Sequence, residues 1–249
     1  MIKFFRKIRQ NLIMENKTSK YFRYAIGEIV LVVIGILIAL QINNWNEERL
    51  ENNREKITVQ NLNTEFQENL RDLDSINTIL KRTILATETI FAKFKEEDFQ
   101  ETDPIDSLLH HVIESPSWKP SEFVLNDLQN SGGLSKLNNP ELKILLFNWS
   151  RFFKELQETM DQTEKTNVNL IEYIREHGSL RNIDTKSKIF PYRRSQLKMN
   201  NASLLQNIQF ENYIDDKLYV LKEFEIAYTQ AKILIQKILK ETTIDEKGP

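Results

Sequence analysis

The segment Ile29–Leu40 reads IVLVVIGILIAL and contains no polar side chain. Extended outward to Tyr24–Ile42, it gives 19 residues, which as a helix cover about 28 Å, close to the thickness of one hydrocarbon core. Aromatic residues flank it, with Tyr24 at one end and Trp45 beyond the other, as is typical of a membrane interface. Because Leu and β-branched residues surround its whole circumference, a buried core helix is disfavoured. The sequence therefore predicts a transmembrane helix over residues 21–45.

The charges on either side of this segment predict its orientation. Residues 1–24 carry seven Lys and Arg side chains against a single Glu15, which gives a net charge of +6. The whole chain has a net charge of −2, so the residues after 24 sum to −8. Because positive residues stay in the cytoplasm, we expect the N-terminus there and residues 46–249 in a periplasm-like or extracellular space. No small-x-small pattern follows the apolar core, which favours an uncleaved signal anchor.

Residues 1–20 form a basic amphipathic segment ahead of the predicted span. Its apolar residues line one side of a helix over residues 2–13, and its basic residues line much of the other. We expect this helix to lie on an anionic leaflet, in the cytoplasm. A nucleic-acid-binding arm is the alternative, but no DNA-binding fold follows, so we expect no nucleic-acid partner. The residues expected at the membrane interface are Lys3, Arg6, Lys7, Arg9, Tyr24 and Trp45.

One side of the predicted span carries a candidate contact face. Gly35 and Ala39 lie within about 20° of Glu28 on a helical wheel. Gly35 and Ala39 also form a small-xxx-small pair, the pattern that lets two membrane helices approach closely. We therefore expect Glu28, Gly35 and Ala39 to contact another helix, from a second copy of the chain or from another membrane protein of the envelope. The alternative for Glu28 is that its carboxylate reaches the cytoplasmic interface.

The positions of glycine and proline predict the rest of the fold. The chain has only 6 of each, and none occurs in residues 36–103, 141–177 or 192–247. Within these stretches apolar residues advance by three and four, which predicts long amphipathic helices that bury their stripes together. We therefore predict an all-α fold: a transmembrane helix and then an antiparallel bundle of long helices, with an irregular insertion of short helices and loops at about 99–140. The stripes are Leu62, Phe66, Leu70, Leu73, Ile76, Leu80 and Ile84; Leu142, Leu145, Trp149, Phe152, Leu156 and Met160; and Ile214, Leu218, Leu221, Phe224, Tyr228, Ala231, Ile235 and Ile238.

Few residues suggest catalysis. The absence of cysteine excludes thiol nucleophiles and thiolate metal sites, and no phosphate-binding, hydrolase or zinc-protease motif occurs. On a helix Asp106, His110 and Glu114 would stack at i, i+4 and i+8, which is one way to hold a metal. Adjacent His110 and His111 would point about 100° apart, so we expect that both cannot join such a site. We predict no catalytic residue, no metal and no cofactor.

Two further places are candidates for contact with a ligand or partner. Trp118 lies between Pro116 and Pro120 in the irregular insertion, where it either anchors the loop on the bundle or contacts a ligand or partner. Arg193 and Arg194 follow an aromatic pair in an otherwise acidic domain, so they could bind an anionic partner, although a solvated loop explains them as well. The Ser131-Gly132-Gly133 sequence predicts a tight turn between helices, with positive φ at one glycine.

The opening of the chain resembles a known family. The residues that carry the likeness are Gly27-Glu28, Gly35 and Asn43-Asn44-Trp45-Asn46, preceded by the basic segment IKFFRKIRQ. In these residues the chain is similar to uncharacterised single-span proteins of Bacteroidota that share a domain of unknown function. Looser likenesses follow at residues 128–139 and 210–212. The resemblance implies a single pass through a bacterial inner membrane with a periplasmic C-terminal domain, and it implies no chemistry.

These features predict a non-enzymatic protein of the bacterial cell envelope. The leading hypothesis is a membrane-anchored helical scaffold or protein-interaction module. The alternative is a sensory or small-ligand-binding ectodomain, because helical bundles can bind small molecules between their helices. Only about 20 residues precede the span, too few for a cytoplasmic output domain, so such a sensor would signal through a membrane partner.

Overall fold

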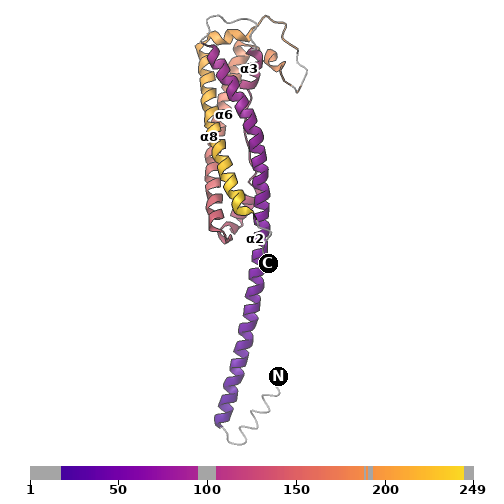
Figure 1. Cartoon of the computed structure of the whole chain (residues 1–249), viewed down its shortest axis with the longest axis vertical. Coiled ribbons are helices and arrows are strands. Elements are labelled where there is room, and N and C mark those ends of the chain that lie inside the picture. The colour runs from indigo at the N-terminus through magenta and orange to yellow at the C-terminus, as the bar shows by residue number, and fades with distance from the viewer. Residues whose placement is uncertain (1–17, 95–104, 188, 190–192, 244–249) are drawn as a thin grey trace. The chain divides into compact units, whose positions relative to one another are not determined.

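All regular structure in the described part of the chain is helical. The computed structural model describes residues 18–94, 105–187, 189 and 193–243, apart from the side chains of residues 18–21 and 24. No strand occurs within these ranges, so the predicted all-α class is confirmed. The elements are α2 (Thr18–Lys93), α3 (Ile105–Val112), α4 (Phe123–Asn130), α5 (Gly133–Lys136), α6 (Pro140–His177), α7 (Leu180–Asp184), the 3₁₀ helix η1 (Asn201–Gln206) and α8 (Ile208–Thr242), shown in Figure 1.

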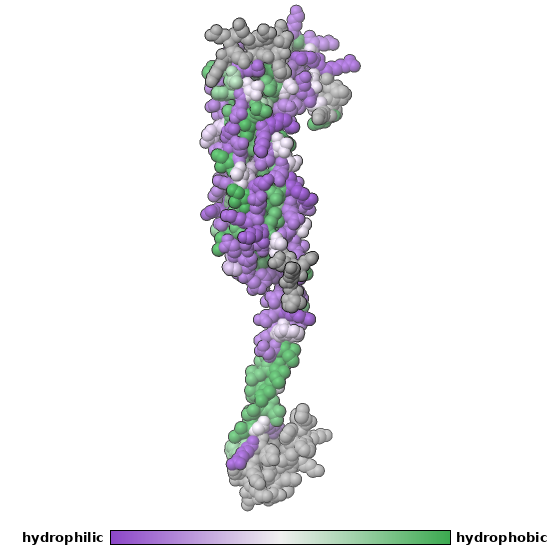
Figure 2. Space-filling model, viewed as in Figure 1, coloured by the Kyte–Doolittle hydropathy of each residue, from purple (hydrophilic) through white to green (hydrophobic). Residues whose placement is uncertain are grey.

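The chain divides into two compact units, Met1–Ile57 and Thr58–Pro249. The hydropathy pattern placed a domain boundary at residues 45–46, whereas the structural division falls twelve residues later. In the first unit α2 carries the apolar segment, seen as a continuous green band in Figure 2. One helix in the described residues is long and apolar enough to cross a membrane, and none of its most apolar 18-residue window is buried. Its mean hydropathy in that window is 2.6.

The second unit is a bundle of long helices in which α8 runs antiparallel to the other two. Against α2, the side chain of Asn63 lies near Thr242 and that of Asp74 near Lys232. Residue numbers therefore rise along α2 as they fall along α8. Against α6 the same holds, because Asn139 contacts Glu241 and Asn167 contacts Lys217. It follows that α2 and α6 run parallel to each other.

Residues 113–122 return the chain to the end of the bundle at which α2 enters it, so that α6 can run in the same direction as α2. This extended stretch, which we call the crossing segment, joins α3 to α4 and runs back along α2. Its first part lies near Arg82 through Glu114, and its last part lies near Asn69 through Ser121. The predicted insertion therefore contains the fourth element of the bundle, the crossing segment, which runs in the direction opposite to α2. Residues 99–104 of the insertion lie outside the described ranges.

The core of the bundle is filled by aromatic side chains. Trp149 of α6 lies with its ring centroid 5.1 Å from that of Phe66 and 6.0 Å from that of Trp118, both in edge-on contact. Trp118 in turn contacts Tyr228, with 5.9 Å between centroids. All four side chains are at most 1% exposed. Such rings bury about 150–250 Å² each, so this cluster supplies much of the apolar burial that stabilises the unit.

Short polar residues set where the helices begin. Asn139 accepts a hydrogen bond from the backbone N–H of Leu142 at 3.0 Å, and Pro140 occupies the first turn of α6. Asn207 caps α8 in the same way, so this helix begins at Ile208 although the stretch without breakers begins at 192. Gly132 adopts a φ of 71° between α4 and α5, which confirms the predicted turn.

Candidate functional site

The predicted membrane face lies on α2 in the first unit. Gly35 and Ala39 are exposed, and a Cβ atom added to Gly35 would meet nothing within 4 Å. The residues Lys3, Arg6, Lys7 and Arg9 lie outside the described residues, as does the side chain of Tyr24. Trp45 is 60% exposed, with the Arg49 guanidinium carbon 5.7 Å from the centre of its ring. The face of Glu28, Gly35 and Ala39 therefore has room for a neighbouring helix at its two small residues.

Trp118 anchors the crossing segment. Its backbone N–H donates to the Tyr228 hydroxyl at 3.0 Å, and that hydroxyl donates to the Pro116 carbonyl at 2.8 Å. Burial raises the pKa of Tyr228 to about 12, so the hydroxyl stays protonated and can keep donating. Because only 1% of Trp118 is exposed, the interpretation as a ligand or partner contact gives way to the anchoring one.

A buried carboxylate fastens the other end of the crossing segment. Glu65 of α2 accepts hydrogen bonds from the Ser121 hydroxyl at 2.7 Å and the Val124 backbone N–H at 3.1 Å. Asn69, one turn further along α2, exchanges two hydrogen bonds with the backbone of Ser121, at 2.7 and 2.8 Å. The negative charge of Glu65 thus lies at the N-terminus of α4, where the helix dipole favours it. These two polar residues of α2 hold the segment in place.

A lysine lies inside the bundle at the start of the crossing segment. Lys217 of α8 has no exposed surface, and its Nζ donates to the Asn167 Oδ1 at 2.7 Å and to the Glu114 carbonyl at 3.0 Å. Desolvation lowers the pKa of Lys217 to about 8, an effect that the nearby Glu114 opposes in part. Asn167 also donates to the Ile113 carbonyl at 3.2 Å. The pair Lys217 and Asn167 therefore satisfies carbonyls that the non-helical backbone leaves open.

The side chain of Glu114 lies among cationic and imidazole groups. Arg82 of α2 donates to both carboxylate oxygens, with nitrogen–oxygen distances of 2.8 and 2.9 Å. His111 Nδ1 lies 3.5 Å from the same carboxylate. Burial, and then the neighbouring His111, lower the pKa of His110. This arrangement ties α2 to the end of α3 by an ion pair.

The metal-binding geometry differs from the one that the sequence suggested. One candidate ligand atom from each of His110, His111 and Glu114 lies within 4.8 Å of the other two, so the expectation that both histidines cannot approach one site is wrong. The reason is that α3 ends at Val112, and Glu114 turns back toward the rings through a bond from its N–H to the His111 carbonyl. Because Arg82 occupies both oxygens of Glu114, we assign this group to the ion pair.

Asp106 is paired with Arg194, one of the two candidate arginines. The Asp106 carboxylate, which belongs to a buried residue, accepts from Arg194 at 2.8 Å and from Asn201 at 2.7 Å. The carbonyl of Arg193 accepts from the Arg181 side chain at 2.8 Å. The Arg194 charge is thus offset within the chain, which weakens its case as an anion site. The structure does not bring Trp118 and the arginine pair to one surface, because Trp118 is buried.

The outward side of α8 carries a second apolar line. Tyr219, Ile226 and Ile233 are 62%, 62% and 48% exposed, and they repeat every seven residues along about 21 Å of helix. The inward side of α8 is separately buried in the core. A helix that packs against only one core needs a single apolar face, so the second line is a candidate contact surface. We call Tyr219, Ile226 and Ile233 the outer line.

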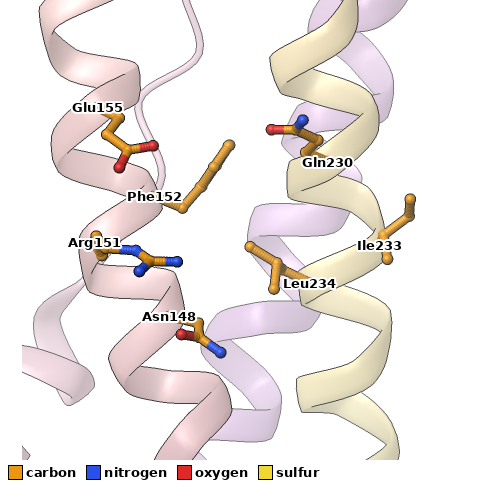
Figure 3. A pocket seen from close by; sticks show the side chains of 7 residues that line it. All are labelled: Asn148, Arg151, Phe152, Glu155, Gln230, Ile233 and Leu234. Carbon is orange, nitrogen blue, oxygen red and sulfur yellow. The ribbon is translucent and has the colours of Figure 1, made fainter.

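A groove between α6 and α8 adjoins the outer line at Ile233. Its volume is about 330 Å³, and the residues that line it are shown in Figure 3. Phe152 and Leu234 point toward each other from the two helices, while Asn148, Arg151 and Glu155 lie along α6. Apolar and charged groups therefore lie side by side, as at the rim of a protein interface. A second groove of about 630 Å³ lies at α4, α5 and α6 and includes the exposed Ile144 and Phe147.

Sequence reasoning missed the residues of both exposed regions. Ile144, Phe147, Ile226 and Ile233 are apolar residues that fall outside the predicted core stripes, and that position was the available signal. The buried charges of Glu65 and Lys217 gave no such signal, because Glu and Lys on an amphipathic helix are ordinarily solvated.

Comparison with known proteins gives a family and no activity. No curated protein and no solved structure matches the chain. A model described as "Family of unknown function (DUF6090)" matches residues 28–156, just over half of the chain. The matched part includes the apolar segment, the crossing segment and most of the aromatic core. The chain therefore belongs to the DUF6090 family of unknown function.

Proposed function

We propose that this chain is a single-span protein of the bacterial inner membrane that binds other proteins through a periplasmic helical domain. The apolar segment of α2 supports a membrane anchor, because each of its large side chains is exposed and not packed against the rest of the described chain. The charge difference of +6 against −8 supports a cytoplasmic N-terminus. The resemblance to single-span proteins of Bacteroidota supports the bacterial envelope as the location.

The observation that carries the binding role is the outer line on α8. Its three side chains align on a helix whose core side is already packed, and Ile233 leads into the groove toward α6. Aromatic and aliphatic anchors beside a polar rim are what protein interfaces use. The core offers less room for a ligand or partner, because aromatic rings fill its centre.

We infer a non-catalytic role for the buried polar groups. Glu65, Asn69 and Lys217 all bond to the crossing segment, and Asp106 bonds to Arg194 and Asn201. Each of these contacts fastens one part of the bundle to another. Such polar groups supply hydrogen bonds to the crossing segment, which has no helical hydrogen bonds of its own.

The topology can be tested with single cysteines, because the chain has none of its own. Lys17→Cys reports the N-terminal side, and Lys198→Cys reports an exposed position of the second unit. In spheroplasts we expect a membrane-impermeant maleimide to label Lys198→Cys at once and Lys17→Cys only after lysis. The reverse order would contradict the proposed orientation, and labelling of both before lysis would contradict the single pass.

The binding role can be tested by photo-crosslinking in cells. A photoreactive amino acid placed at Ile226 should give a discrete cross-linked protein band. The matched control is Leu85 on α2, which is 65% exposed but lies outside the outer line. No band at either position, or equal bands at both, would contradict a specific interface at the outer line.

The groove between α6 and α8 is the place where the alternative function, binding of a small ligand, can be tested. Its volume of about 330 Å³ is at the lower end of small-molecule sites. Native mass spectrometry of the full chain from mild detergent would detect a bound small molecule. A stoichiometric non-lipid adduct that Phe152→Ala removes would favour the sensory function over the interaction module.

A further inference from the structure

The first unit of α2 keeps exposed apolar residues beyond the apolar segment itself. Ile42, Leu50 and Ile57 are 61%, 45% and 57% exposed. Leu50 and Ile57 lie among strongly polar neighbours, and exposing them to water gives a solvated helix no stability. The described residues of the first unit do not cover them, so a partner is the explanation that we pursue.

These residues share one side of the helix with the small residues of the span. At about 100° per residue, seven positions from Gly35 to Ile57 fall within an arc of about 80°. We call them the pairing stripe, and each is exposed. Its members are Gly35, Ala39, Ile42, Asn46, Leu50, Asn53 and Ile57.

In the highly charged stretch at residues 47–56, no charged residue belongs to the pairing stripe. Seven of the ten residues at 47–56 are charged, and the three that are not are Leu50, Asn52 and Asn53. Two of those three belong to the stripe. The acidic residues Glu48, Glu51 and Glu55 lie about 140–180° from the middle of the stripe on the helix. A line without charge through so charged a segment is typical of a seam between helices.

The spacing of the stripe specifies a handedness. Beyond Ala39 the steps are three, four, four, three and four, so Ala39 and Leu50, and likewise Asn46 and Ile57, are eleven residues apart. An eleven-residue repeat gives a right-handed supercoil, whereas a seven-residue repeat gives a left-handed one. Gly35 and Ala39 independently favour a right-handed crossing, because small-xxx-small pairs allow that close approach.

The partner that fits each position of the stripe is the same helix from a second copy of the chain. Copies inserted in one orientation place the same residue at the same depth, so glycine meets glycine and Asn46 meets Asn46. Asparagines at a helix seam pair with each other and fix the register, at some cost in stability. An unrelated helix would have to reproduce small, apolar and amide positions in the same order.

We propose that two copies of the chain pair in parallel through this stripe, with a right-handed crossing. The pairing rests on the proposed single-span topology, which makes the two helices parallel. It goes beyond the proposed function by naming a second partner, another copy of the chain, and a surface for it within the first unit. It is independent of the outer line, which lies in the second unit.

Disulfide cross-linking in native membranes tests the proposal. Single cysteines replace each residue from Asn46 to Ile57 in the full chain, and an oxidant then traps pairs whose Cα atoms lie within about 7 Å. We expect cross-linking to peak at Asn46, Leu50, Asn53 and Ile57, roughly fivefold above Glu48, Glu51 and Glu55. A left-handed pair would peak at Arg49 and Lys56 in place of Leu50 and Ile57.

A substitution within the span gives the second readout. Gly35→Leu on the Asn53→Cys background should reduce the disulfide several-fold, because a larger side chain separates the helices. Ile34→Leu is the matched control, since it lies off the stripe. Peaks at Arg49 and Lys56, cross-linking without a period, or an unchanged yield in Gly35→Leu would each overturn the proposal. Failure of the topology itself would appear separately, in the labelling of Lys17→Cys and Lys198→Cys.

Discussion

Two parts of the same helix bury their apolar residues very differently. In α2 the large side chains of Ile29–Leu40 are 47–64% exposed, all around the helix. Those of Leu62, Phe66 and Leu73 are at most 1% exposed and lie on one stripe. Backbone geometry is the same in both parts, so the distribution of side chains alone decides the surroundings. A circumference that is apolar throughout suits lipid, and a single stripe suits a bundle.

The largest predicted effect removes the centre of the bundle core. Trp149→Ala should lower the free energy of unfolding by about 3–5 kcal/mol, because it leaves a cavity between Phe66 and Trp118. Urea unfolding of the full chain in mild detergent, followed by far-UV circular dichroism, measures this. Ile34→Ala in the apolar segment serves as the control and should leave the transition unchanged. A loss below about 1 kcal/mol would show that the two parts do not differ in this way.

The next effect places a charge in the apolar segment. Ile34→Arg should disfavour membrane insertion by about 2.5–3.5 kcal/mol, as a charge at the centre of a membrane helix does. The fraction that resists alkaline carbonate extraction reports insertion. The control is Ile226→Arg, another exposed apolar position, in the second unit, which should stay in the membrane fraction. If Ile34→Arg were retained as fully as the parent, the apolar segment would not be the anchor.

A charge inside the bundle has a smaller and pH-dependent effect. The pKa of Lys217 is about 8 in the folded chain, against an ordinary value of 10.5, so the unfolded chain binds more protons between these values. Stability should therefore rise with pH from about 8, by up to about 2 kcal/mol at pH 9.5. Above pH 10 the raised pKa of Tyr228 acts in the opposite direction, so the range of measurement ends below it.

Urea titrations at pH 7.5 and 9.5 check this pH dependence. Lys217→Met keeps the length of the side chain but has no proton to lose, so its stability should not rise over this range. A rise of equal size in Lys217→Met would assign the effect to other groups.

The smallest effect concerns the start of α6. Asn139→Ala removes the side-chain acceptor for the Leu142 N–H and should cost about 1 kcal/mol. Asn139→Ser keeps a capping oxygen but loses the contact with Glu241, so it should recover most of that loss. The same urea titration measures both. An equal loss in the two variants would assign the effect to Glu241 and not to the cap.

The parts of the fold that depend on helical period were predictable from the sequence. The stretch without breakers at 141–177 matches α6, which runs from Pro140 to His177, because glycine and proline mark its ends. The stripe of α8 from Ile214 to Ile238 was also predicted correctly for most members, and Leu218 alone is only partly buried. Leu70, Ile76, Phe152 and Met160 likewise lie at the edge of the core.

The crossing segment was not predictable, because it has no period. Its position depends on contacts between residues far apart in sequence, such as Ser121 with Glu65 and Trp118 with Tyr228. The sequence therefore did not show that α2 and α6 run parallel. Nor did it show that Lys217 and Glu65 are buried, since their partners come from that segment.

The same segment constrains when the domain can fold. Trp118 and Tyr228 are 110 residues apart, and Lys217 with Glu114 spans 103. These contacts cannot form until α8 has been synthesised, so the core of the unit stays open until that helix has emerged. Folding is consequently a late event that follows the passage of most of the chain. On the topology proposed above, this order of events keeps the second unit unfolded while it crosses the membrane.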